Sequence, residues 1–269
     1  MIRLFDTPDS HLPNQAAQEP WLDSESDAEG FASELDEFQS VRLKLNPNST
    51  RIVFSMDAAG LAAEQYRRLR RKLVEHFPKG AVLLVTGSGK SEGKTLNSIN
   101  LAWCMAEGNM PTLLAELDVR QPQVAKTLGV QVRTGIEGLL TGGVEPAKAI
   151  WKVDGLPLYV AAASRAQKHA SDIIKAVAVK RFVQRFKRRF PWIVIDSPPV
   201  MPAADVSEIL PAADAAIFVV RVRKTPEELL RKSVETLGSK LWGVLLNEAT
   251  LCQDSYYRYL SGYYAQDGL

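Results

Sequence analysis

A glycine-rich loop between an apolar strand and a helix constrains this chain more than any other feature. In VLLVTGSGKSEGKTLNSINLA the apolar run 82–86 leads into glycines and then into Gly93, Lys94 and Thr95. Small residues let backbone N–H groups turn inward around phosphate oxygens, and a helix N-terminus attracts the anion. The loop departs from the GxxxxGK[ST] pattern, because Ser88 stands at the first glycine position. We expect a variant phosphate loop, with the lysine on the phosphates and the threonine hydroxyl on magnesium. A surface turn with a chance GKT is the alternative.

Short apolar runs alternate with helical patterns along most of the chain. The expected strands are 81–86, 112–118, 157–162, 192–197, 215–222 and 242–247. The expected helices are 58–76, 95–107, 171–189, 204–210 and 226–236, with a mixed stretch at 121–156. This alternation predicts an α/β fold with a doubly wound, mostly parallel sheet and helices on both faces. Ligands then bind at the carboxyl ends of the strands.

Three acidic side chains stand at the ends of two expected strands. Glu116 and Asp118 close one strand, and Asp196 closes another in the manner of an acid that holds magnesium directly or through water. A single acid at a strand end is as often a helix cap. Because three of them follow a GKT loop in one chain, we interpret them together as a nucleotide and metal site.

Charge is distributed unevenly along the chain. Residues 1–40 hold ten acids and one base, so the remainder has 32 bases and 21 acids, or a net charge of +11. We interpret residues 1–50 as an acidic, disordered N-terminal arm, which either binds a partner or is simply solvated. No apolar run is long enough to span a membrane, and the first residues lack a signal-peptide core, so we expect a cytoplasmic protein. Cys104 and Cys252 lack zinc-ligand spacing.

Tyrosines gather at the C-terminus, in the segment 251–269. Five of the seven fall in the last fourteen residues, namely Tyr256, Tyr257, Tyr259, Tyr263 and Tyr264. Beside a nucleotide site we interpret them as phosphate acceptors. An aromatic docking peptide, or a tail that packs on the domain, is the alternative.

These features together resemble the bacterial tyrosine autokinases of capsule and exopolysaccharide export, which are similar in fold to the septum-site and partition ATPases. Four motifs carry the resemblance: the loop 87–95, ELDVRQP for D-x-D-x-R, IDSPP for the Walker B strand, and E-x-x-R-x-x-R in AEQYRRLRRKL. The resemblance covers roughly residues 55–264. It implies a P-loop kinase domain at 51–250, of the deviant Walker type.

The resemblance also implies an activity and its residues. The chain would be an ATP-dependent protein-tyrosine autokinase that phosphorylates its tail in trans, with ATP and Mg²⁺ as cofactors. The implied catalytic residues are Lys94, Glu116, Asp118 and Asp196, and the implied metal ligands are Thr95, Asp118 and Asp196. The implied nucleotide contacts are Gly89, Lys90, Ser91, Glu92, Gly93, Lys94, Thr95, Leu96 and Asn247, and Arg120 matches the motif arginine.

Partners follow from the same resemblance. Glu64, Arg67 and Arg70 would join neighbouring subunits of a ring, although their helical spacing also suits a plain ion pair on a solvated helix. The expected second partner is a membrane-embedded polysaccharide co-polymerase, which would hold the chain at the inner face of the membrane. We expect no membrane span in this chain. Nucleic acid is not expected either, because the basic helices lack interleaved aromatic residues.

The sequence departs from the family pattern in three places. Glu116 replaces the usual aspartate, Lys90 and Ser91 replace a small pair in the loop, and no co-polymerase region is fused at the N-terminus. Two alternatives keep the fold and change the function. One is an ATPase switch of the partition type, which has no need of a tyrosine cluster. The other is a degenerate regulatory subunit, which would bind nucleotide without turnover, or bind none, and would act as a scaffold for the export machinery.

Overall fold

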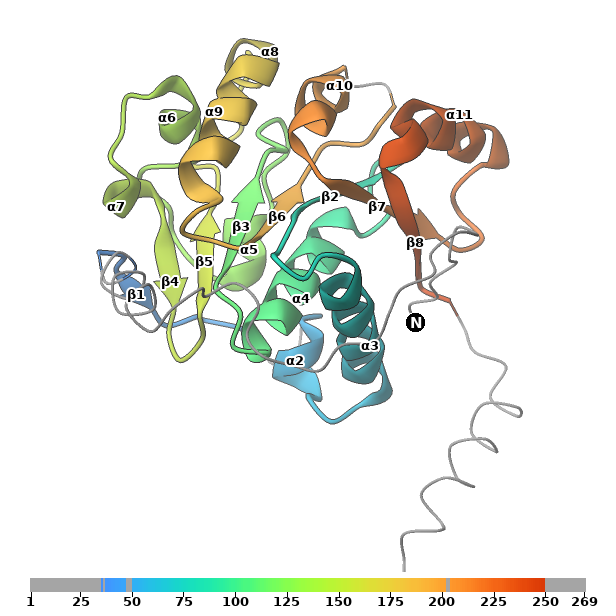
Figure 1. Cartoon of the computed structure of the whole chain (residues 1–269), viewed down its shortest axis with the longest axis horizontal. Coiled ribbons are helices and arrows are strands. Elements are labelled where there is room, and N and C mark those ends of the chain that lie inside the picture. The colour runs from blue at the N-terminus through green and yellow to red at the C-terminus, as the bar shows by residue number, and fades with distance from the viewer. Residues whose placement is uncertain (1–34, 36, 47–49, 202–203, 250–269) are drawn as a thin grey trace, which may run out of the picture.

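The fold is centred on a single sheet, in a computed structural model that describes residues 35, 37–46, 50–201 and 204–249. Over those residues the strands follow the order β1-β4-β5-β3-β6-β2-β7-β8 (Figure 1), and every pairing is parallel except that of β4 with β5. The strands are β1 (Ser40–Val41), β2 (Val82–Gly87), β3 (Thr112–Glu116), β4 (Trp151–Val153), β5 (Leu158–Ala161), β6 (Trp192–Asp196), β7 (Ala215–Arg221) and β8 (Leu241–Asn247).

Helices cover both faces of this sheet. On one face lie α2 (Val53–Met56), α3 (Leu61–His76), α4 (Lys94–Glu107) and α5 (Val124–Leu128). On the other lie α6 (Ile136–Thr141), α7 (Pro146–Ala149), α8 (Ala170–Ile173), α9 (Ala176–Phe186), α10 (Asp205–Ile209) and α11 (Glu227–Leu237), with the 3₁₀ turns η1 (Leu210–Ala212) and η2 (Gly238–Lys240). Side chains of β2 alternate between the two cores, because successive strand residues point to opposite faces: Val82 and Leu84 join one, and Leu83 and Val85 the other.

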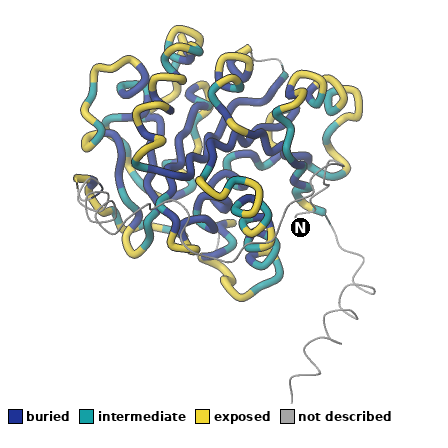
Figure 2. The backbone as a smooth tube through the Cα atoms, viewed as in Figure 1, coloured by how far each residue is buried: buried dark blue, intermediate teal, exposed yellow. Residues whose placement is uncertain are grey.

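This arrangement confirms the predicted doubly wound, mostly parallel sheet. The central strands β3, β6, β2 and β7 are buried along nearly their whole length (Figure 2). In the register of the sheet, Asp196 at the end of β6 stands opposite Glu116 of β3 on one side and Val85 of β2 on the other. The ends of three neighbouring strands are thereby brought together beside the loop that follows β2.

The expected helix at 171–189 is wrong in its extent, because the segment forms two helices. α8 ends at Ile173 and α9 begins at Ala176. Between them Ile174 is buried with ψ 87°, which is not helical. The backbone N–H of Ala176 donates to Glu208 of α10 at 2.7 Å, so a distant side chain satisfies the start of the second helix. The apolar periodicity continues across this break and does not reveal it.

The domain also begins earlier than the predicted boundary at residue 51. β1 pairs in parallel with β4, with Ser40 opposite Lys152, and Phe38 is buried in the core. Its ring lies 5.6 Å from that of Tyr159 and 6.0 Å from that of Phe190, measured between centroids. The acidic composition of the region conceals these contacts. Residues 1–34 of the predicted arm and the tyrosine-rich segment 251–269 lie outside the described residues.

None of the helices in the described ranges is both long enough and apolar enough to cross a membrane.

Candidate active site

The loop after β2 requires glycine at two of its positions. Gly93, the residue that precedes α4, has φ +95°, and a Cβ there would lie 2.1 Å from the side-chain nitrogen of Asn247. A Cβ on Gly87 would lie 2.4 Å from Oε2 of Glu92. Only glycine adopts this left-handed backbone without strain and leaves room for these close approaches. The predicted strand, loop and helix are therefore present, and helix α4 begins at Lys94.

Two polar side chains fix the shape of this loop. Glu92 accepts hydrogen bonds from the N–H of Gly89 at 3.0 Å and from the hydroxyl of Thr225 at 2.8 Å. Asn247, at the end of β8, donates to the carbonyl of Glu92 at 2.8 Å, and Arg221 donates to the carbonyl of Ser91 at 3.0 Å.

The side chains of Glu92 and Asn247 bind the loop itself. Neither these two residues nor Gly89 lines the cavity beside the loop, and their expected nucleotide contacts stay predictions. Thr225 and Arg221, which complete the brace, belong to no motif that the sequence presents. Their position above the loop depends on the pairing of β7 with β2 and β8.

Lys94 lies folded back over the loop. Its side chain is largely buried, and Nζ donates to the carbonyl of Gly89 at 2.6 Å. Burial lowers the pKa of Lys94, while the nearby carboxylates of Asp196, Glu92 and Asp118 raise it in opposition. An ammonium group with little water around it gains strongly from an anionic ligand. The phosphate-binding role of Lys94 stays a prediction, and its position in the loop agrees with it.

Asp196 is the most perturbed acid of the site. It is completely buried, and Oδ1 accepts a hydrogen bond from the hydroxyl of Ser98 at 3.1 Å. Thr95 is near enough to lower the pKa of this carboxyl, whereas Oδ2 has no hydrogen-bond partner among the described residues. Burial, reinforced by the charge of Glu116, raises the pKa of Asp196 to about 8. A cation bound beside the threonine hydroxyl would give this buried carboxylate oxygen the partner that it lacks.

Glu116 is held by backbone groups from two other segments of the chain. It is also completely buried, but Oε1 accepts the N–H groups of Gln123 at 2.6 Å and Val124 at 2.8 Å, and Oε2 accepts that of Ala163 at 2.9 Å. Burial raises the pKa of Glu116, and the three hydrogen bonds oppose this rise because they stabilise the carboxylate. Both oxygens accept backbone N–H groups, so this carboxylate holds the backbone at the start of α5 and after β5, and its expected catalytic role stays a prediction.

Asp118 and Arg120 stand at the open side of the site. The N–H of Gln121 donates to Asp118 at 3.1 Å, and burial raises the pKa of the Asp118 carboxyl. Arg120 donates to both oxygens of Asp205, at 2.6 and 3.1 Å, and to the hydroxyl of Ser171 at 2.8 Å. The motif arginine is therefore anchored by α10, which the sequence pattern gives no means of foreseeing.

A cavity of about 840 Å³ opens over the loop and these side chains. Its lining residues are Lys90, Ser91, Gly93, Lys94, Thr95, Leu96, Asp118, Arg120, Gln121, Gln123, Thr127, Pro198, Pro199 and Ala204. Six of the predicted nucleotide contacts and Asp118 are in this set. The walls formed by α5 and by Pro198, Pro199 and Ala204 were not predicted, because their side chains match no phosphate-binding pattern.

The donor set fits magnesium bound together with a nucleotide. Over the described part of the chain no three His, Cys, Asp or Glu side chains gather into a metal cluster. Magnesium at nucleotide sites needs fewer protein ligands, because it keeps several waters and takes oxygens from the phosphates. Thr95, Asp118 and Asp196 supply one hydroxyl and two carboxylates beside the phosphate loop.

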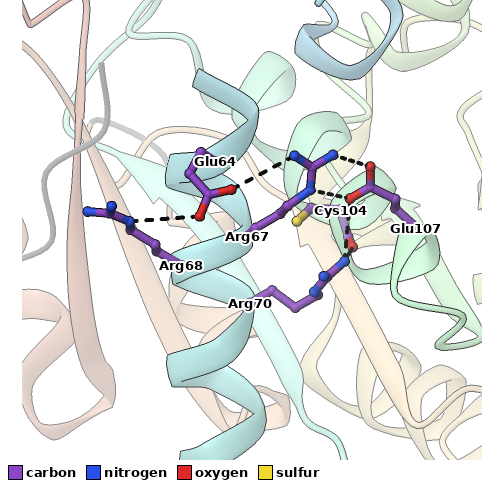
Figure 3. A network of polar contacts seen from close by, with 6 residues as sticks. All are labelled: Glu64, Arg67, Arg68, Arg70, Cys104 and Glu107. Atoms are coloured by element: carbon purple, nitrogen blue, oxygen red, sulfur yellow. Dashed lines mark hydrogen bonds and ion pairs between the residues drawn. The ribbon is translucent and has the colours of Figure 1, made fainter. Parts of the chain in front are cut away.

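The predicted subunit-contact residues lie on α3, and two of them turn toward α4 (Figure 3). Arg67 donates to both oxygens of Glu107, at 2.9 and 2.5 Å, and lies 3.9 Å from Glu64. Arg70 donates to the carbonyl of Cys104 at 2.7 Å. The arginines thereby tie α3 to the C-terminal end of the helix that begins at the phosphate loop. Contact between subunits through these residues stays a prediction, as does phosphorylation of the tail.

Comparison with known proteins identifies relatives of two kinds. No family model matches the chain. The succinoglycan biosynthesis transport protein ExoP of Rhizobium meliloti is 28% identical over 177 residues, which are 63% of this chain and 22% of that protein. The tyrosine-protein kinase CpsD of Streptococcus agalactiae is 24% identical over 191 residues, or 70% of this chain and 82% of that protein. The chain thus spans about a fifth of ExoP and most of CpsD.

Solved structures give the same fold. The VpsO kinase domain has a TM-score of 0.65 at 25% identity, covering 73% of this chain and 99% of that one. The kinase domain of the Escherichia coli tyrosine kinase ETK has a TM-score of 0.69 at 20% identity, covering 77% and 83%. The septum-site-determining protein MinD of Pyrococcus horikoshii, solved with Mg-ADP, has a TM-score of 0.52 at 18% identity, covering 61% and 66%. The P-loop fold and the resemblance to bacterial tyrosine kinases are confirmed.

Proposed function

We propose that this relative of the bacterial tyrosine kinases is an ATP-dependent protein-tyrosine autokinase. It transfers the γ-phosphoryl group of ATP to tyrosines of the C-terminal cluster of a neighbouring copy, and so regulates the polymerisation and export of a capsule or exopolysaccharide. The observation that carries the proposal is that Lys94 and Thr95 line one cavity, while the buried carboxylate of Asp196, with one oxygen that has no hydrogen-bond partner among the described residues, lies next to both. Relatives named as tyrosine kinases support the choice of acceptor.

The phosphate loop would bind the triphosphate. Amides at the start of α4 and the Lys94 ammonium face the same space, and the lysine exchanges its bond with the Gly89 carbonyl for phosphate oxygens. Magnesium, when bound, would neutralise charge on the phosphate oxygens, held by Thr95 and Asp196 with Asp118 on the open side. Ser98 keeps the Asp196 carboxylate in place through its hydrogen bond.

We assign Asp118 to the tyrosine acceptor. It faces the cavity, and burial makes its carboxylate a better proton acceptor than a solvated aspartate. The tyrosine oxygen attacks the γ-phosphorus, its proton passes to Asp118, and the bond to the bridging oxygen breaks as ADP leaves with the electron pair. Arg120, fixed by Asp205, lies in the cavity wall where charge develops on the transferred group.

Assembly and location belong to the same proposal. Transfer in trans needs neighbouring copies, and we assign Glu64, Arg67 and Arg70 to the contact between them in a ring. A membrane-embedded co-polymerase would hold the ring at the inner face of the membrane, which ExoP, a transport protein of succinoglycan biosynthesis, supports by similarity.

Intact-mass spectrometry of the full chain tests this function. After incubation with Mg²⁺ and ATP we expect additions of one phosphate mass or multiples of it. The additions should vanish in Lys94→Met and in a chain truncated before Tyr256. A matched control is Lys126→Met, an exposed lysine outside the phosphate loop, which should be phosphorylated normally. ATP binding with no added mass, also in the presence of the partner's cytoplasmic segment, would contradict the kinase and favour a nucleotide switch or a regulatory subunit.

A further inference from the structure

The outer surface of α9 and of the turn after it carries only positive charge. From residue 175 to residue 189 there are seven bases and no acid, namely Lys175, Lys180, Arg181, Arg185, Lys187, Arg188 and Arg189. The inward side chains of this segment, such as Phe182 and Phe186, belong to the core. A solvated helix face usually mixes both signs of charge, so a face of a single sign indicates attraction of an anionic partner.

Some of these bases have partners and others do not. Lys187 pairs with Asp214 at 2.8 Å, and Arg189 pairs with Glu37. For Lys180, Arg181 and Arg188, by contrast, no carboxylate within the described ranges forms an ion pair. Arg181 and Arg185 are four residues apart on α9 and lie on one side of it, and Arg188 follows in the turn after the helix.

Beside this arginine row lies a partly apolar groove. It has a volume of about 390 Å³ between α9 and η1. Its lining residues are Ala176, Val177, Lys180, Val183, Gln184, Lys187, Pro211 and Ala212. Val177 is 63% exposed, one of two large apolar side chains that stand out from the described surface. Apolar surface rimmed by lysines suits a chain segment that alternates apolar and acidic residues.

The N-terminal segment of the chain joins the body at this surface. Phe38 packs against Phe190, which follows α9, and Leu35 belongs to the same core as Phe182. Glu37 forms its ion pair with Arg189 at the end of the basic segment. The acidic segment therefore already forms one ion pair with the basic segment that follows α9.

The residues before this point have the complementary composition. Residues 1–34 contain eight acids and one base, and among the acids stand Leu12, Trp21, Leu22 and Phe31. Thirty-four residues reach far beyond the roughly 16 Å length of α9, at about 3.3 Å per extended residue and 1.5 Å per helical residue. Tethering also keeps the local concentration of the segment high.

We propose that residues 1–34 dock in cis on the basic outer face of α9, with an apolar side chain in the Val177 groove. The acids lie along the row formed by Arg181, Arg185 and Arg188, and the ion pair of Glu37 with Arg189 is the last of this series. The docked segment adjoins α10, because Glu208 of that helix binds the first N–H of α9. A polycationic partner, or high salt, would release it.

Zero-length carbodiimide cross-linking of the full chain tests the proposal, because it joins carboxylates to lysine amines that touch them. At low ionic strength we expect peptides from residues 1–34 to be linked to Lys180 and Lys187 at least about tenfold more often than to the exposed reference lysines Lys126 and Lys224. A mixture of ¹⁵N-labelled and unlabelled chains assigns each link, and we expect both peptides of a link to carry the same label.

Charge reversal supplies the matched variants. Arg181→Glu, Arg185→Glu and Arg188→Glu together leave both groove lysines reactive, and we expect them to reduce the links by at least about tenfold. The control combines Arg71→Glu, Lys79→Glu and Arg133→Glu, three exposed bases outside the α9 segment, with the same change in net charge. It should leave the links unchanged. A matching melting curve for each variant verifies the fold.

Three outcomes would overturn the proposal. Links spread evenly over all exposed lysines would mean that the segment does not dock. Links that mix labelled with unlabelled peptides would mean that it binds a second copy. An equal loss of links in the control variant would mean that only net charge matters, and that the α9 face has no special part in the attraction.

Discussion

The ends of β3 and β6 present two carboxylates that look alike and behave differently. Glu116 and Asp196 face each other in the register of the sheet, and both are completely buried. Both oxygens of Glu116 accept backbone N–H groups, three in all, whereas Asp196 accepts the hydroxyl of Ser98 on one oxygen and its other oxygen has no partner among the described residues. A strand-end acid with partners on both oxygens supports the backbone, and one with an unpartnered oxygen can accept a cation.

The difference also explains the departure of Glu116 from the family pattern. A glutamate reaches one methylene further than an aspartate, and here that length spans from the end of β3 to the first turn of α5 and to Ala163. Replacement of the usual aspartate therefore does not by itself imply an inactive site. Asp118 is the acid that lines the cavity, and the buried Asp196 lies beside Thr95, another residue of the lining.

The largest expected effect comes from Asp196→Asn. Autophosphorylation should fall by at least about 100-fold, because a preorganised charge that faces the metal is lost. The fold should persist, since an asparagine oxygen still accepts the Ser98 hydroxyl and no buried charge remains. Initial rates of phosphate incorporation measure the effect, with the exposed Asp154→Asn as control. An active, magnesium-dependent Asp196→Asn enzyme would break the distinction between the two acids.

Glu116→Gln should act on stability instead. One glutamine oxygen cannot serve three N–H groups, and its amide would face a donor, so we expect a loss of about 1–3 kcal/mol in the free energy of unfolding. Urea denaturation of the nucleotide-free chain measures it. Glu116→Asp should also destabilise, because the shorter side chain cannot reach all three groups. Unchanged stability combined with lost metal binding would reverse the roles assigned to the two carboxylates.

The pH dependence of stability sharpens the comparison further. Burial raises the folded-state pKa of Asp196 to about 8, while an unfolded aspartate titrates near about 3.9. The protonated carboxyl therefore stabilises the fold at low pH, and this contribution declines as pH rises from about 4 through about 8. Melting temperatures between pH 5 and pH 8.5 should fall more steeply in the unmodified chain than in Asp196→Asn. Bound magnesium nucleotide should flatten the slope, because a cation favours the carboxylate.

The smallest effect is expected from Ser98→Ala. Loss of its hydrogen bond to Asp196 removes about 1 kcal/mol of support for the carboxylate. Affinity for magnesium nucleotide should weaken roughly fivefold at pH 7 and less at pH 9, where the carboxyl is ionised in any case. Isothermal titration calorimetry at the two pH values measures the change. An effect of equal size at both pH values would indicate that Ser98 acts on packing rather than on the charge.

The sequence predicts the local part of this site and misses the part that depends on tertiary contacts. Strand β2, the glycine loop and the start of α4 are contiguous, so their pattern and spacing identify them. Asp196 follows from a buried strand that ends in an acid. The hydrogen bonds that Glu116 accepts come from N–H groups 7, 8 and 47 residues away, which no local pattern encodes.

Long-range contacts also account for the remaining differences. Arg120 matches a motif, but its anchor Asp205 lies 85 residues further on. The break before α9 depends on Glu208. Strand β1 lies at the end of an acidic segment, and it forms because it pairs with the edge of β4. In each case a side chain or strand from elsewhere satisfies backbone groups that the local sequence leaves open.

Binding of ATP with and without magnesium, measured by calorimetry in Asp196→Asn and Glu116→Gln side by side, tests the central claim most directly. The account predicts that magnesium strengthens binding in the unmodified chain and in folded Glu116→Gln, and that Asp196→Asn loses this gain while it still binds nucleotide through Lys94. Magnesium-dependent binding that survives in Asp196→Asn and disappears in Glu116→Gln would contradict it.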